Sequence, residues 1–108
     1  MRASVRESAL NQLRLCATLA ERDALRYTPA GVPVVNCILQ YAGETVEAQT
    51  PRQVEFAIAA MGIGQIGQRL ERTPLGAMLD CEGFLARKHR NSKALVFHIT
   101  GCKAFEKD

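Results

Sequence analysis

Four cations and no acid lie within seven residues of the chain, in the stretch FLARKHRNSKALVF (84–97). They are Arg87, Lys88, Arg90 and Lys93. Apolar runs flank them on both sides, which predicts a hairpin loop between two strands, turning at Asn91-Ser92. Because like charges this close repel one another unless a polyanion neutralises them, the pattern favours binding to phosphates over a solvated hairpin tip. The net charge of the whole chain is only +3, so the predicted contact is local.

No residues in the sequence form a recognisable catalytic constellation: it has no nucleophile elbow, phosphate-binding glycine loop or zinc-protease helix. His89 adds a hydrogen-bond donor to the basic segment. His98 alternates with apolar neighbours on a predicted strand, so it faces away from the core. Isolated cysteines in apolar stretches predict reduced, partly buried thiols without the paired spacing of a zinc site: Cys16, Cys37, Cys81 and Cys102. The sequence therefore predicts no enzyme, no metal and no cofactor.

The length and composition are those of one small globular domain. The 108 residues can form a modest core, and 47% hydrophobic with 23% charged residues is ordinary globular composition. No apolar run approaches the roughly 18 residues of a membrane span, and the first ten residues lack a signal-peptide core. We expect a cytoplasmic protein without membrane contact, with a flexible arm over residues 1–10 and one domain over residues 11–108.

Most of the chain has the alternating pattern of half-buried strands. In residues 11–19 the leucines and Ala17 point one way, and the polar residues with Cys16 point the other. Ala42-Gly43-Glu44 predicts a short turn, and Pro51 in the following strand implies an edge position or a bulge. The predicted strands cover residues 11–19, 34–41, 45–60, 75–85 and 94–105.

A single helix is predicted, over residues 63–72, and its glycines weaken it by about 1 kcal/mol each. Five short strands with a helix in this place predict an all-β fold, a five-stranded OB-fold barrel (Greek key) with at most one short helix between strands 3 and 4. Gly83, inside the fourth strand, suits a tight barrel bend. An SH3-like barrel is the main alternative. In an OB-fold the loop between strands four and five is one that binds nucleic acid, and here it is the basic segment.

Aromatic side chains that could stack on bases are scarce, with two tyrosines, four phenylalanines and no tryptophan. Tyr27, beside Arg26 in the first long loop, is the best candidate for stacking, and a plain packing role is the alternative. Phe84 and Phe97 are expected in or near the core. Binding should therefore be more electrostatic than stacking-driven.

Two stretches resemble the bacterial single-stranded-DNA-binding protein superfamily: NQLRLCATLAERDALRYTPAGVPVVNCIL (11–39) and PLGAMLDCEGFLARKHR (74–90). Within it, the segments GFLARKHRNSK and LVFHI resemble the PriB family. That resemblance implies an OB-fold homodimer that binds single-stranded DNA and joins the primosomal helicase and helicase-loading proteins in replication restart.

The resemblance carries DNA-binding roles over to particular residues of this chain. The matching positions are Arg26, Arg87, Lys88, Arg90 and Lys93, while Arg14 and Arg52 are added on charge and strand position. Some PriB proteins have a DNA-contacting tryptophan where this chain has Glu55, and Phe56 beside it should face the other way. Two alternatives stay open: a general single-strand-binding protein without an acidic tail, and an OB-fold adaptor with little DNA binding whose basic loop docks on an acidic protein.

Overall fold

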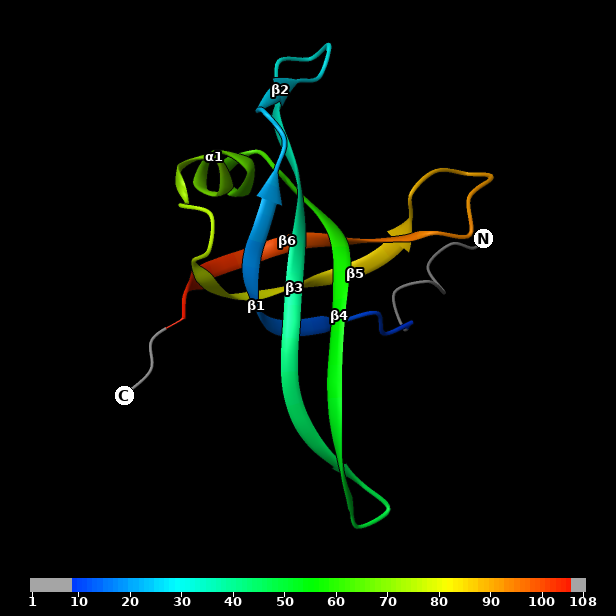
Figure 1. Ribbon diagram of the computed structural model, residues 1–108. Helices are drawn as coiled ribbons and strands as arrows, with labels where there is room; N and C mark the ends of the chain where they lie inside the picture. Colours follow the sequence, from blue (N-terminus) through cyan, green and yellow to red (C-terminus); the bar gives the residue numbers. More distant parts are fainter. Residues whose placement is uncertain (1–8, 106–108) are drawn as a thin grey trace.

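The computed structural model describes residues 9–105, in which five long strands close into a barrel (Figure 1). The elements are β1 (Leu13–Arg22), β2 (Arg26–Tyr27), β3 (Pro33–Glu47), β4 (Thr50–Ile63), α1 (Gln65–Arg72), β5 (Met78–Arg87) and β6 (Leu95–Ala104). The sheet order is β1-β5-β6-β4-β3-β2, and the pairing of β1 with β3 closes the barrel. All pairs are antiparallel except β4 with β6. The predicted OB-fold is therefore confirmed. The predicted arm, residues 1–10, lies outside the described residues except for its last two.

The core follows the predicted alternation. On β1, Ala17 and Leu19 are buried while Arg14 is exposed, as predicted. His98 on β6 faces outward between buried neighbours, also as predicted. The largest fully buried side chains are Phe97, Leu19, Leu39, Leu70, Val35 and Cys81.

Gly83 allows β5 to cross β6 closely. A Cβ built at this glycine would lie 1.8 Å from the backbone oxygen of His98, which is far inside any tolerable contact. The β5–β6 register also shifts between Glu82 and Gly83. The predicted role of this glycine at a tight barrel bend is confirmed, because the bulge bends the sheet and a side chain could not fit.

The turn predicted at residues 42–44 is wrong. The strand β3 continues to Glu47, and the turn is made by Ala48 and Gln49, whose φ angles of 51° and 66° suit a two-residue hairpin. Gly43 lies within the strand, and the Tyr41 ring lies over it. A Cβ at this position would be 2.4 Å from the tyrosine Oη, so a residue with a side chain would not fit with the ring in this place. The result is a long β3–β4 ribbon that projects from the barrel (Figure 1).

Pro51 lies in this ribbon, paired with Val46. In the described residues β4 pairs with β6 only at residues 60–62, so at Pro51 the other side of β4 has no neighbouring strand. The predicted edge position is confirmed, since a proline cannot donate to a ladder on that side.

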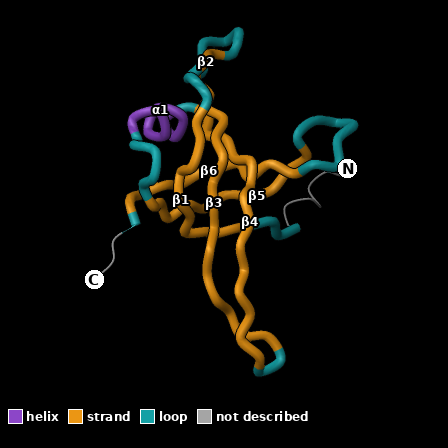
Figure 2. Tube along the Cα trace, viewed as in Figure 1, coloured by secondary structure: helices purple, strands orange, loops and turns teal. Residues whose placement is uncertain are grey.

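Among residues 9–105 there is one helix, α1, drawn in purple in Figure 2, and it follows β4 and precedes β5 in the sequence as predicted. Gly67 faces the barrel, where a Cβ would come within 2.9 Å of the Gly62 carbonyl oxygen, so this glycine allows close packing while lowering helix propensity. At the other end, the Arg22 guanidinium donates to the carbonyl oxygens of Leu70 and Thr73, and the Leu70 oxygen also accepts from the Thr73 N–H at 3.1 Å. Among residues 9–105, no helix has the length and apolar content to cross a membrane.

Candidate nucleic-acid interface

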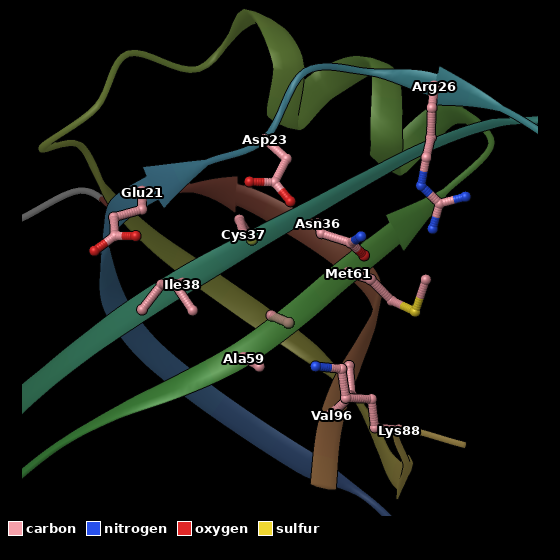
Figure 3. Close-up of a pocket in the computed structure, with 11 residues that line it drawn as sticks. Glu21, Asp23, Arg26, Asn36, Cys37, Ile38, Ala59, Met61, Lys88 and Val96 are labelled. Carbon is pink, nitrogen blue, oxygen red and sulfur yellow. The ribbon is translucent and has the colours of Figure 1, made fainter. Parts of the chain in front are cut away.

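A groove of about 410 Å³ crosses the outer faces of β3 and β4 (Figure 3). Its floor comes from two cross-strand pairs, Asn36 with Met61 and Ile38 with Ala59. These residues point outward because their neighbours along each strand fill the barrel interior. The small Ala59 side chain leaves the centre of the floor low. This face and the loops at its two ends are where OB-folds bind oligonucleotides.

One end of the groove is formed by the hairpin that carries β2, in the segment that was predicted as the first long loop. Arg26 and Tyr27 pair with Val34 and Pro33 of β3. The tip is fixed by Thr28, whose hydroxyl oxygen accepts a 3.1 Å hydrogen bond from the Val32 N–H. Arg26 lines the groove, and Tyr27 is 65% exposed, so its ring is open to a ligand.

The other end is formed by the loop between β5 and β6. The Lys88 N–H donates to the Ala94 carbonyl at 2.9 Å, which extends the strand pairing and places this lysine in the groove lining. The Ser92 N–H donates to the His89 carbonyl at 3.0 Å, so the turn is centred on residues 90–91, one residue before the predicted position. Arg90 and Lys93 are exposed in this loop.

The loop does not present all four predicted cations on one face. Arg87 is the last residue of β5 and pairs with Leu95, whereas Lys88 follows it and lines the groove. Because successive residues of an extended segment point to opposite sides, Arg87 faces away from the groove. The groove therefore brings together two of the predicted residues, Arg26 and Lys88.

Arg14 and Arg52 lie elsewhere, and each is paired with an acid. Arg14 holds Asp80 through bonds of 2.7 and 3.1 Å, and this contact lowers the pKa of the Asp80 carboxyl and raises that of the guanidinium. Arg52 contacts Glu47 at 2.7 Å near the far end of the β3–β4 ribbon. A neighbouring carboxylate therefore partly neutralises the charge of each of these arginines.

Acids that were not predicted as part of the site also line the groove. Figure 3 shows Glu21 and Asp23 on one side of the groove and Arg26 and Lys88 on the other. Glu55 of β4 pairs with Ala42 of β3, which points to the same side as the outward residues of β3. Glu55 therefore lies on the same face of the β3–β4 ribbon as the groove. A polyanion in this groove is therefore expected to follow the cationic side.

Phe56 faces away from Glu55, as predicted. It pairs with Tyr41 on the opposite face of the ribbon, with ring centroids 5.2 Å apart and planes at 28°. This aromatic pair is therefore on the wrong side of the sheet to contact a ligand in the groove.

Phe84 was predicted in or near the core, and this is wrong, whereas the prediction for Phe97 is confirmed. Phe84 is 38% exposed on the outer face of β5 and stacks on His98 of β6, with centroids 4.8 Å apart and planes at 11°. The alternation contained the signal: Leu85 and Phe97 point inward, so the residues beside them must point outward.

The cysteines match the prediction of buried thiols. Cys37, Cys81 and Cys102 are buried and Cys16 is partly buried, all unbridged. Loss of solvent raises the pKa of Cys37 to about 12, so its thiol is protonated at neutral pH and unreactive.

Comparisons with known proteins agree with this geometry. A profile described as "Another single-strand binding protein family" matches residues 11–101. A replication restart protein PriB from Bordetella pertussis is 39% identical over 90 residues, covering 83% of this chain and 84% of that protein. PriB from Ralstonia solanacearum, whose three-dimensional structure is known, is 58% identical in sequence with a TM-score of 0.84, covering 91% of this chain and all of the other. The single-strand-binding domain of a Synechococcus protein is 25% identical with a TM-score of 0.66, covering 87% of this chain and 94% of the other.

Proposed function

This chain belongs to the single-strand binding protein family and, within it, to the PriB proteins, and from that premise we propose that it binds single-stranded DNA in the groove during replication restart. The observation that carries the proposal is the placement of Arg26 and Lys88 in one hollow on the face that OB-folds use for oligonucleotides. The protein acts by binding, without catalysing a reaction itself, at replication forks in the cytoplasm.

The phosphate chain is held by the cationic side of the groove. Arg26 and Lys88 neutralise phosphates at its two ends, and the exposed Arg90 and Lys93 extend the contact past the loop. Tyr27, open to solvent beside Arg26, stacks on a base. An unpaired strand suits this arrangement because its bases are free to turn towards the floor while its backbone follows the cations.

Partners are part of the proposal. The relatives are named replication restart proteins, so we place this chain in the primosome, joining the helicase to the helicase-loading proteins. We also propose a homodimer. Residues 13–17 of β1 pair with β5 on one side, whereas the pairing of β1 with β3 begins at Thr18. Within residues 9–105 this stretch therefore has an edge open to a second chain.

The second candidate is an OB-fold adaptor that binds an acidic protein surface and little DNA. The acids of the groove favour it, because Glu21, Asp23 and Glu55 would repel phosphates on the same face. Such an adaptor would use the basic loop alone.

The test is fluorescence anisotropy of a labelled oligonucleotide, single-stranded or duplex, over a salt series. Four phosphate contacts, at Arg26, Lys88, Arg90 and Lys93, predict a log–log salt slope of about −3 on the single strand. We expect preferential and salt-sensitive binding of the single strand. Equal binding of the two forms at low salt would refute the proposal, and absent binding would both refute it and favour the adaptor.

A further inference from the structure

A second hollow, of about 280 Å³, lies on the outer side of β4, β6 and β5 next to the groove. Its walls are Met61 and Ile63 of β4, Ile66 of α1, and the stacked rings of Phe84 and His98. Ile99 and Thr100 of β6 complete the lining, so apart from the His98 imidazole and the Thr100 hydroxyl the hollow is apolar, although it lies on the outside of the barrel.

The stacked pair has no role in the core. Leu85 and Phe97 occupy the inward positions of the same two strands, and Phe97 is fully buried. Phe84 and His98 are directly opposite each other in the β5–β6 register, so their rings meet across the strands in nearly parallel planes. An aromatic ring left 38% exposed in this way offers a surface to a flat ligand.

The hollow adjoins the groove. Met61 lines both, and it is in register with His98 across the parallel β4–β6 pair. In Figure 3, Met61 lies on the side of the groove with Arg26 and Lys88, away from Glu21 and Asp23. A DNA strand that follows the cations therefore passes the entrance of the hollow. There, a base could turn away from the phosphate chain and enter the hollow.

We propose that Phe84 and His98 form a stacking platform for one unpaired nucleobase of the strand in the groove. The inference rests on the proposed function, and it adds an aromatic contact to a site otherwise built from charges. Stacking requires only a π-face, so the platform accepts any base and adds affinity without sequence preference. The alternative occupant, an apolar side chain of a partner protein, is one outcome of the test.

The first experiment compares the wild type with Phe84→Leu on two single strands, one with bases and one with abasic residues throughout. We expect Phe84→Leu to bind the normal strand about 5-fold more weakly or worse, and the abasic strand as tightly as the wild type does. Phe56→Leu is the matched control, because Phe56 is also 38% exposed and stacked, but on the other face of the ribbon. It should change neither affinity.

The second experiment uses fluorescence and does not depend on the loss of a side chain. The chain has no tryptophan, so Phe84→Trp and Phe56→Trp each introduce a single indole. The emission of Phe84→Trp should be quenched by the normal strand and not by the abasic one. Emission of Phe56→Trp should be unchanged by both.

The outcomes separate the two proposals. If the wild type binds no single strand, the proposed function fails and this inference fails with it. If the wild type binds but Phe84→Leu loses nothing, or loses equally on the abasic strand, only the platform is overturned. Quenching of Phe84→Trp by a partner protein and not by DNA would assign the hollow to that partner and also overturn it.

Discussion

The loss of two positive charges that line the groove should flatten the salt dependence of DNA binding, whereas the loss of two charges outside the proposed site should not. We compare the double variant Arg26→Gln with Lys88→Gln against a second double variant, Arg14→Gln with Arg52→Gln. Both lower the net charge by two, so long-range attraction to DNA changes equally. Only the first pair lines the groove, while the second pair is held by Asp80 and Glu47.

The magnitude follows from counterion release. Each phosphate neutralised on a single strand contributes about 0.7 to the log–log salt slope, so the groove variant should flatten the slope by about 1.4. With four contacts, affinity falls about 50-fold between about 50 and 200 mM salt, and with two it falls about 7-fold. The control variant should keep the wild-type slope.

Fluorescence anisotropy on a labelled single strand, at four or more salt concentrations, measures these slopes. Circular dichroism and thermal melting establish that all variants are folded. Equal slopes for the two double variants would refute the reasoning, because they would show that net charge matters and the groove does not.

Three further predictions concern single side chains. Glu55→Gln removes an acid from the binding face and should tighten single-strand binding by about 1.4- to 5-fold at low salt, with no gain at high salt; weaker binding would place the strand elsewhere. Gly83→Ala puts a methyl group against the His98 carbonyl and should lower the free energy of unfolding in urea by about 1–3 kcal/mol or more; unchanged stability would mean that the bulge relaxes freely. Arg14 lowers the pKa of Asp80, so this carboxylate stabilises the fold above its unfolded pKa of about 3.9 and the effect is lost as pH falls through the lower folded value. Asp80→Asn should therefore lower the melting temperature at pH 7, with the gap narrowing towards pH 3; a constant gap would contradict this.

The barrel could be predicted because each strand carries the period-two pattern that burial on one side requires. The exceptions have tertiary causes. Gly43 reads as a turn residue in the sequence, but it is needed for the ring of Tyr41, two residues away in the same strand. The actual turn uses Ala48 and Gln49, which have no strong turn signature, and strand pairing on both sides imposes their conformation.

The site was predicted less completely than the fold. Charge density identified the basic loop, but alternation divides its cations between two faces, and only Lys88 enters the groove. Glu21 and Asp23 lie more than sixty residues from that loop in the sequence, so their place in the same groove depends on how the barrel closes. Phe84 was assigned by hydrophobicity when its strand position already placed it outside.

The most direct test of where the strand lies is a ¹⁵N–¹H correlation spectrum of the 108-residue protein, recorded during titration with a short single strand. We expect the largest shifts at the groove and the neighbouring hollow, in residues 26–27, 36–38, 59–61, 84, 88–93 and 96–98. Shifts centred on Arg14 and Arg52, or spread evenly over the surface, would contradict a single-stranded DNA site between the β2 hairpin and the β5–β6 loop.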